Sequence, residues 1–432
     1  DNTITFQIKL TYETLPGEEI YILGEGKDFG NWTNPNFKLY WSEGNIWTAD
    51  YTISTSIEFV KFKFVVKGNN SMKWEEGSNR LLSTRCLKGL KQTKDGKYIL
   101  DCIWGHFIIN FNIHYIVNNT SYMRMIGGTD ALHNWMSSVR LELDNNKKIV
   151  AKDGNEIEVF WNQTFWMRST EPKNYNFDYR YSVYDEHLKS AIWEREPNRH
   201  IHILTELNNQ NYHNYKNNPD EYKLLTNCYL EVLDVNFVAD LIFNKMGDKN
   251  IYIGPYPQNI EDYKRLKDAG ITATLNVQSN GDLLHRQINL ELHKRQEDEI
   301  GIEIHHYPIQ DFNSGDLENR LKGAGDKLNE LLHRGKVVYV HCTAGMSRAA
   351  ATVIIYLVLH ENWKVWDAKE FCKRHRPVIC PNYGIINQVA RKYKPGKEMS
   401  NNNDEKRDIE NEWKKMRENE RAFWKQKDKE RE

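Results

Sequence analysis

The sequence has few cysteines and no excess of charge of either sign. Its six cysteines are spread over 432 residues without a Cys-x-x-Cys pair, which predicts neither a disulfide scaffold nor a zinc site. The formal net charge of −1 argues against a protein that coats nucleic acid. Any site for an anionic substrate must therefore be basic only locally.

Long apolar runs are also absent. No run approaches the roughly 20 apolar residues that span a bilayer, and the first residues lack the basic start and apolar core of a secretory signal. We therefore expect no membrane association and a reducing, cytoplasmic location. Aromatic residues are abundant instead: 13 Trp and 23 Tyr exceed the needs of the cores and suit flat binding surfaces.

The first 205 residues repeat one pattern twice. Short alternating runs, separated by clusters of Gly, Asn and Asp, are typical of β-sandwiches. The same landmarks recur in the same order, so we predict two tandem antiparallel β-sandwich modules, at residues 1–102 and 103–205. The paired landmarks are Asp28–Trp32 with Asp130–Trp135, Phe62–Phe64 with Tyr179–Tyr181, and Trp74–Arg80 with Trp193–Arg199.

The pattern changes after residues 200–219, a polar stretch that we expect to be a linker. Between residues 220 and 395, helical and apolar strand patterns alternate, which indicates an α/β domain with a largely parallel sheet. Residues 396–432 are charged throughout and predict a solvated helical tail. Its few apolar residues form a stripe that could dock on the body or form a homodimer, although a frayed tail fits equally well.

The strongest chemical signal is the segment from Val340 to Arg348, which reads Val-His-Cys-Thr-Ala-Gly-Met-Ser-Arg. It lies between an apolar strand and a long apolar helix, where loop N–H groups and the helix dipole favour an anion. The same field favours the thiolate of Cys342, and Arg348 offers a planar fork for two phosphate oxygens. The spacing predicts a phosphate-binding loop with His341, Thr343, Ala344, Gly345, Met346 and Ser347.

Two further points concern this loop. Gly345 would let the backbone approach the anion closely, and His341 is expected to orient the loop through a hydrogen bond instead of acting as a base. The alternative is a buried structural cysteine beside an arginine that caps a helix. That alternative suits a lone cysteine, whereas the complete spacing in a strand–loop–helix context favours catalysis.

A cysteine phosphatase also needs an acid that protonates the leaving oxygen. Asp311 ends an apolar segment about thirty residues before the motif and is the candidate. The alternative is a loop residue that caps the next helix, a role for which Asp316 is better placed. In the predicted chemistry, Cys342 attacks phosphorus while Asp311 protonates the departing oxygen, and Asp311 then activates water to hydrolyse the phosphocysteine. No metal or cofactor is required.

Residues 220–393 resemble the dual-specificity phosphatases, and the Cys-Thr-Ala-Gly-Met stretch resembles the laforin-like glucan phosphatases. The resemblance implies the removal of phosphate monoesters from α-glucans and a contact of Phe312 with the glucan chain. There are two departures from the pattern. Ser347 stands where these enzymes generally carry Gly, and Ala349 stands where most dual-specificity phosphatases carry a hydroxyl side chain.

The two tandem modules resemble family-20 starch-binding modules. Tryptophan suits the flat apolar faces of sugars, and neighbouring polar groups can hold the hydroxyls. Burial in the core is the alternative for any single tryptophan, and we expect it for Trp47 and Trp166. In the first module the resemblance implies glucan contacts at Trp32, Lys63, Trp74, Glu75 and Asn79. In the second module it implies contacts at Trp135, Arg180, Trp193, Glu194 and Asn198.

These patterns together predict a glucan phosphatase that uses a phosphocysteine intermediate on phosphorylated starch, amylopectin or glycogen. One alternative is a protein phosphatase that the modules recruit to glycogen or starch. The other is a non-catalytic glucan-binding scaffold, against which the intact Cys342, Asp311 and Arg348 argue.

Overall fold

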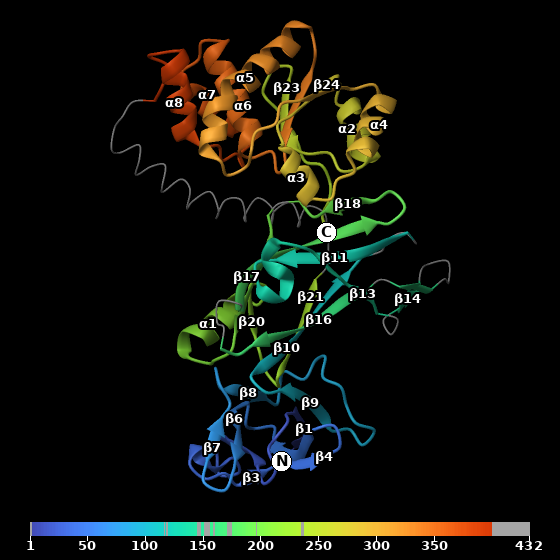
Figure 1. The fold of residues 1–432 in the computed structure, drawn as a ribbon, viewed down its shortest axis with the longest axis vertical. Helices are drawn as coiled ribbons and strands as arrows, with labels where there is room; N and C mark the ends of the chain where they lie inside the picture. Colours follow the sequence, from blue (N-terminus) through green and yellow to red (C-terminus); the bar gives the residue numbers. More distant parts are fainter. Residues whose placement is uncertain are drawn as a thin grey trace. The chain divides into compact units, whose positions relative to one another are not determined.

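The computed structural model describes residues 2–115, 117, 120–144, 148–150, 156–158, 160–170, 175–195, 197–234 and 237–399. Contacts divide the chain into two units (Figure 1). Unit 1 comprises residues 1–181 and 198–237, and unit 2 comprises residues 182–197 and 238–432. The predicted helical tail and the homodimer contact expected of it lie outside the described residues, apart from residues 396–399.

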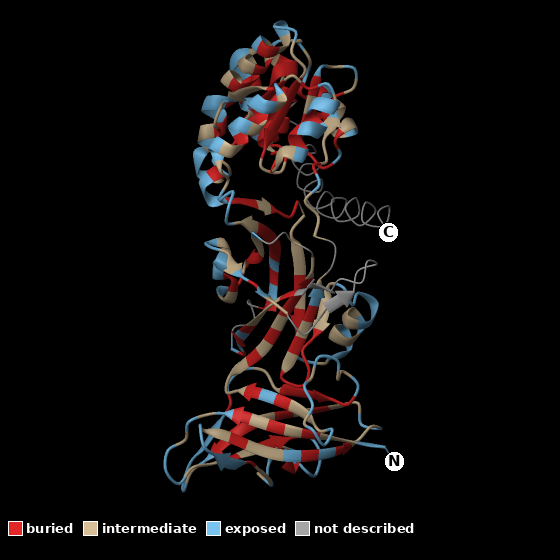
Figure 2. Ribbon diagram, turned by 90° about the vertical axis from the view of Figure 1, so that its right-hand side faces the viewer, coloured by how far each residue is buried: buried red, intermediate tan, exposed pale blue. Residues whose placement is uncertain are grey.

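The first module of unit 1 is built from two sheets. In one, β1 (Thr3–Thr11) lies between antiparallel β5 (Ile46–Ser54) and parallel β9 (Tyr98–Ile103). In the other, β6 (Phe59–Lys67) pairs with β2 (Glu19–Gly24). Alternate residues of the strands are buried because side chains alternate between the two faces (Figure 2). The remaining elements are η1 (Gly30–Trp32), β3 (Phe37–Lys38), β4 (Tyr40–Ser42), β7 (Met72–Trp74) and β8 (Arg80–Ser83).

The second module repeats the main strand pairings of the first and adds β14, β15 and β20. β10 (His106–His114) pairs antiparallel with β16 (Phe160–Arg168) and parallel with β21 (Tyr229–Asp234), as β1 does with β5 and β9. β17 (Asn176–Asp185) pairs with β18 (Ser190–Trp193) and β19 (Arg199–Leu204), as β6 does with β7 and β8. The other elements are β11 (Ser121–Gly127), η2 (Asp130–Trp135), β12 (Val139–Arg140), β13 (Glu142–Leu143), β14 (Lys148–Val150), β15 (Glu156–Glu158), α1 (Asn209–Asn217) and β20 (Tyr222–Leu224).

The linker expected at residues 200–219 is wrong. That stretch contains most of β19 and all of α1, whose first turn is capped by the Asn208 side chain. β20 and β21 then pair with β19 and β10. Residues 222–234 therefore extend the sheets of unit 1, although their sequence was assigned to the α/β domain. Asn favours turns, but here Asn208 caps α1, and the other Asn and Tyr residues of the stretch lie mostly within that helix.

Unit 2 is an α/β fold around a five-stranded sheet of order β22-β23-β26-β24-β25. All neighbours in it are parallel except β22 and β23, so the predicted fold class, β modules followed by an α/β domain, is confirmed. Its elements are β22 (Asn244–Lys245), β23 (Ile251–Pro255), α2 (Ile260–Asp268), β24 (Ala273–Asn276), α3 (Asn280–His285), α4 (Leu290–Ile300), β25 (Glu303–His306), α5 (Ser314–His333), β26 (Val338–Cys342), α6 (Arg348–Leu359), α7 (Val365–His375) and α8 (Tyr383–Tyr393).

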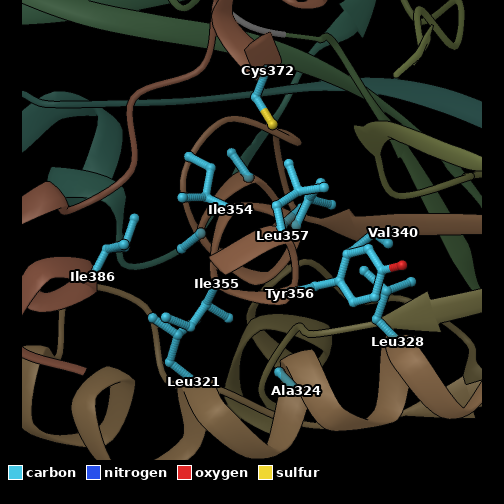
Figure 3. Packing of buried hydrophobic residues seen from close by; sticks show 14 of the residues in the cluster. Leu321, Ala324, Leu328, Val340, Ile354, Ile355, Tyr356, Leu357, Cys372 and Ile386 are labelled. Carbon is cyan, nitrogen blue, oxygen red and sulfur yellow. The ribbon is translucent and has the colours of Figure 1, made fainter. Parts of the chain in front are cut away.

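The core of unit 2 surrounds α6. Every residue from Arg348 to Val358 is buried, as expected for a helix that is apolar on all sides. Side chains of α5, α7, α8 and one face of β26 pack around it (Figure 3), while α2 and Ile302 pack with Tyr339 on the other face. This packing fixes β26 and α6, and with them the loop between. Within the described residues, no helix is long and apolar enough to cross a bilayer.

Candidate active site

Cys342 ends the central strand β26, and Arg348 begins α6. The predicted strand–loop–helix context is therefore confirmed, with residues 343–347 forming the loop. Cys342 is buried, and the N-terminus of the buried helix follows directly, so the positive end of the helix dipole lies at the loop. A thiol in this position is suited to attack a bound phosphate monoester.

Arg376 binds the loop from its outer side. Its guanidinium donates to Gly345 O at 2.8 Å and to Ala344 O at 3.4 Å, and Asn244 Oδ1 accepts from it at 2.7 Å. Burial lowers the pKa of Arg376 to about 10, which still leaves it charged at neutral pH. Because the C=O and N–H of a trans peptide point in opposite directions, carbonyls held outward leave the loop N–H groups facing the opposite side, where an anion can bind.

The remaining loop contacts complete this arrangement. Thr343 O accepts from Tyr256 N at 3.3 Å, and Met346 O accepts from Cys380 N at 2.8 Å. Gly345 has a φ of +66°, and a Cβ there would lie 2.1 Å from the backbone carbon of Gly254. Only glycine therefore allows the loop to pack against β23. Ser347 stands at the N-cap of α6 and makes no capping hydrogen bond through its side chain.

Arg348 is held in a network of acceptors while 3 % exposed. Its Nη1 donates to Asp282 Oδ2 at 2.6 Å and to Ile309 O at 2.9 Å, and its Nη2 lies 2.9 Å from Asp311 Oδ2. Asp282 is itself fixed, because Ser279 N and Ser279 Oγ both donate to it. The buried Nε makes no hydrogen bond within the described part of the chain, and it is a donor that a phosphate oxygen can use.

Asp311 lies against Arg348 at the edge of the loop. Burial raises the pKa of its carboxyl group, and the positive charge of Arg348 opposes that rise. The carboxyl therefore keeps its proton to a higher pH than an exposed aspartate does. The alternative role as a helix cap is wrong, because Asn313 caps α5 and accepts from Asp316 N at 2.9 Å.

His341 lies buried directly before Cys342 on β26. A backbone hydrogen bond with Cys342 raises the pKa of His341 and opposes the effect of burial, but among the described residues no side-chain hydrogen bond of normal geometry reaches the rest of the loop, so the orienting role stays a prediction. Alternation along β26 directs His341 away from Cys342, into a cavity of about 230 Å³ that also touches His293 and Glu297. Burial lowers the pKa of His341 to about 3, so the ring is neutral at physiological pH, consistent with the prediction that it is not a base.

The carboxyl group of Glu297 in this cavity provides a test of stability against pH. Burial raises its pKa from 4.5 to about 7, so the folded state keeps a proton that the unfolded state has lost. Stability from this group therefore falls as pH rises from about 4.5 to about 7. We expect Glu297→Gln to stabilise unit 2 by up to about 3 kcal/mol at pH 8 and by only about 1 kcal/mol at pH 5.

Urea denaturation of the full chain, followed through loss of phosphatase activity, would measure this difference at both pH values. Gln can still accept the hydrogen bond that Thr274 Oγ1 donates to Glu297 Oε2 at 3.2 Å. Exposed Glu318→Gln serves as the control and should show no such pH-dependent gain. Equal effects of Glu297→Gln at pH 5 and pH 8 would contradict the assignment.

A second, open pocket of about 730 Å³ lies beside the loop and is lined by Thr343, Asp311 and Phe312, among others. Phe312 is fully exposed and has a φ of +53°. Both features are uncommon for a bulky aromatic residue, and strained backbone of this kind gathers at functional sites. The ring is thus presented to solvent at the edge of the pocket, next to Asp311 in the chain.

The first module brings its two predicted platforms together. Trp32 and Trp74 stack with ring centroids 6.5 Å apart and an interplanar angle of 26°, and both remain accessible. Lys63, on β6, and Asn79, which follows β7, are both half-buried. Lys63 Nζ donates to Glu75 O at 3.1 Å. The two rings form a surface suited to the apolar faces of a sugar chain.

Glu75 does not belong to that surface. Its side chain is 2 % exposed, forms a buried ion pair with Arg80, and accepts from Gly105 N at 2.9 Å. The prediction of a sugar contact by its carboxylate is therefore wrong. A buried carboxylate needs paired charge and hydrogen bonds, and Arg80 supplies them within the protein.

The second module keeps one platform and has lost the other. Trp135 is half-buried and has the same φ of +66° as Trp32. Trp193 is only 4 % exposed and Glu194 only 6 %, so their predicted sugar contacts are wrong. β18 is covered within unit 2, whereas the corresponding β7 is an exposed strand.

Two more predictions for the second module concern buried side chains. Arg180 is buried, which contradicts its predicted sugar contact, and it donates to Asn198 Oδ1 at 2.8 Å. Asn198 is half-buried, and its sugar contact stays a prediction. Trp47 is in the core as expected, but Trp166 is 56 % exposed on β16, and its predicted burial is wrong. An alternating strand places every second residue on one face, and Trp166 falls on the open face.

Sequence reasoning missed Asp282 and Arg376. Asp282 belongs to a capping box with Ser279, which is readable from the sequence as a helix start but says nothing of Arg348. Arg376 follows the end of α7 and carries no local motif. Each acts on the loop from more than 25 residues away in the chain, and no single-sequence pattern connects such positions.

Comparison with known proteins agrees with this site. Residues 251–394 match the family described as "Dual specificity phosphatase, catalytic domain", and residues 2–93 match "Starch binding domain". A protein of Invertebrate iridescent virus 6 that is named as a tyrosine phosphatase is 30% identical over 142 residues, which is 33% of this chain and 86% of the viral protein.

Two plant proteins named as phosphoglucan phosphatases are also similar. A chloroplastic one of Arabidopsis thaliana is 31% identical over 153 residues, which is 34% of this chain and 26% of that protein. An amyloplastic one of Castanea sativa is 30% identical over 146 residues, which is 33% of this chain and 38% of that protein. The chain thus spans well under half the length of each plant relative. It belongs to the dual-specificity phosphatases, which are cysteine-dependent enzymes, and it carries a starch-binding domain at residues 2–93.

Proposed function

We propose that the protein removes phosphate monoesters from α-glucans of the starch and glycogen type. The observation that carries the proposal is the fully exposed ring of Phe312 beside the acid Asp311, at the edge of the pocket. An aromatic ring held in solvent there can stack on a sugar whose phosphate enters the loop. The starch-binding domain and the names of the two plant relatives support the same substrate class.

In the proposed reaction, the loop N–H groups and Arg348 bind the phosphate dianion. Cys342 Sγ attacks phosphorus, the bond from phosphorus to the sugar oxygen breaks, and Asp311 gives its proton to that oxygen. Asp311 then removes a proton from water, the resulting oxygen attacks phosphorus, and the S–P bond breaks to release inorganic phosphate. Ala349 has no hydroxyl that could assist the second step, whereas Ser347 has one that no cap engages.

The test is phosphate release from purified phosphorylated amylopectin, compared with a panel of phosphopeptides at equal concentrations of phosphate ester. We expect a higher kcat/KM on the glucan. High turnover on phosphopeptides with little release from amylopectin would replace this proposal with a protein phosphatase recruited to starch or glycogen. No hydrolysis of either substrate, or of a small aryl phosphate, would indicate a non-catalytic scaffold.

We further propose that starch is bound mainly by the first module. Trp32→Ala removes one of two stacked rings and should weaken binding to insoluble starch about tenfold or more, as loss of a tryptophan anchor commonly does. Trp135→Ala should have a much smaller effect, because its predicted partner Trp193 is buried. Trp166→Ala removes a more exposed ring, on β16, and is the control. Sedimentation with starch measures all three, and equal losses for Trp32→Ala and Trp135→Ala would contradict the proposal.

A further inference from the structure

We propose that Arg286 positions the sugar unit whose phosphate is removed, and that Trp193 holds Arg286 in place. The proposal rests on the proposed glucan phosphatase function and names a further substrate contact for it. Arg286 is a substrate-positioning residue in this account, and Trp193 acts through it. The same tryptophan that resembles a starch platform in sequence therefore supports the catalytic pocket.

Arg286 lies on the wall of the catalytic pocket. It follows the last residue of α3 and lines the 730 Å³ pocket together with Asp282, Asp311 and Thr343. All three of these residues contact Arg348. The half-buried side chain of Arg286 is therefore close to the reacting groups without being part of the phosphate-binding loop.

Trp193 contacts Arg286 in two ways. Its indole N–H donates to Arg286 O at 2.8 Å, and the Arg286 guanidinium lies 5.4 Å from the centre of the Trp193 ring. One contact fixes the backbone of Arg286, and the other favours one direction of its side chain through a cation–π interaction. Because both its backbone and its guanidinium are held, the Arg286 side chain loses little conformational freedom when a ligand binds.

Trp193 is itself rigidly held within unit 2. Its backbone N–H donates to Gln258 Oε1 at 2.7 Å, and its carbonyl accepts from Gln258 Nε2 at 2.8 Å. Two residues later, Arg195 and Asp262 form an ion pair at 2.8 Å in which both side chains are nearly fully buried. These contacts explain why residues 182–197 belong to unit 2, and they make β18 a firm support for the pocket wall.

The side chains that line the pocket around Arg286 favour a sugar, instead of the transferred phosphoryl group, as its ligand. The phosphoryl group already has the loop N–H groups and Arg348. The pocket beside Arg286 is lined by the carboxamides of Asn280 and Gln310, which can donate to and accept from hydroxyl groups. A volume of about 730 Å³ fits a ligand much larger than phosphate. We therefore assign hydroxyl groups of the phosphorylated glucosyl unit to Arg286.

The test compares Arg286→Ala and Trp193→Phe with the wild-type full chain on phosphorylated amylopectin and on a small aryl phosphate. Arg286→Ala should raise KM for the glucan and lower the ratio of glucan to aryl phosphate kcat/KM about 10- to 100-fold, as loss of hydrogen bonds from a charged group does. Trp193→Phe keeps an aromatic ring but loses the indole N–H, so a smaller decrease of about 2- to 10-fold is expected. Arg391→Ala, an exposed arginine on α8, is the control and should behave as wild type.

The possible outcomes separate the explanations. Equal losses of kcat on both substrates would show that Arg286 acts on the phosphoryl group, and an unchanged ratio in Arg286→Ala would also overturn the proposal. If Trp193→Phe lowers Tm and both activities together, with the ratio unchanged, Trp193 is only structural. Failure of the wild-type enzyme to release phosphate from amylopectin would instead refute the proposed function, which is a distinguishable result.

Discussion

Replacement of Cys342 by serine is expected to abolish phosphate release. The attack needs an anionic sulfur at the end of β26, where loop N–H groups and the α6 dipole stabilise negative charge. A serine hydroxyl is not ionised at neutral pH, and His341 cannot deprotonate it, because His341 points away into its own cavity. We expect a loss of at least about 10⁴-fold in kcat, comparable to the loss of other nucleophiles.

The same variant should still bind insoluble starch, because Trp32 and Trp74 lie in unit 1. Release of inorganic phosphate from amylopectin and from an aryl phosphate would be measured together with starch sedimentation. Cys86→Ser, which changes a half-buried cysteine of unit 1, is the matched control and should retain full turnover. Substantial activity in Cys342→Ser would remove Cys342 from the mechanism.

Replacement of Asp311 by asparagine is expected to lower kcat on phosphoglucan about 10²–10⁴-fold, the usual contribution of a positioned acid. The loss should be smaller on an activated aryl phosphate, whose leaving oxygen needs little protonation. Asparagine keeps a hydrogen-bond acceptor toward Arg348 Nη2, which lies 2.9 Å from the present carboxylate. Asp311→Asn therefore removes the proton donor but keeps a contact with Arg348, whereas Asp311→Ala would remove both.

The pH profile provides a second measurement for Asp311. Burial raises its pKa, so the acid form persists to higher pH than usual and wild-type activity on glucan should fall as that proton is lost. Asp311→Asn should lack this alkaline decline. Asp326→Asn changes a carboxylate on α5 that pairs with Lys322 and should leave the profile as it is. Equal losses on both substrates with an unchanged profile would exclude Asp311 as the acid.

The catalytic residues could be predicted because their geometry is mostly local. Cys342, the loop and Arg348 are contiguous, and an apolar strand followed by an apolar helix fixes how such a segment turns. The exposed ring of Phe312 was implied by resemblance alone, because an αL backbone at a phenylalanine has no signature in one sequence. Asp311 was found through its place after an apolar segment, although its contact with Arg348 is a long-range one.

By itself, the sequence determined the two repeated β patterns, the α/β domain, and the strand–loop–helix segment with its proposed nucleophile Cys342 and proposed acid Asp311. Only the tertiary structure decided that Arg376 holds the loop carbonyls outward, that Asp282 holds Arg348, and that Trp193 is buried while the corresponding Trp74 is exposed. The physical reason is that periodicity and motif spacing report which side of a strand a residue occupies. They do not report what covers that side, and β7 and β18 occupy the same place in their sheets with different surroundings.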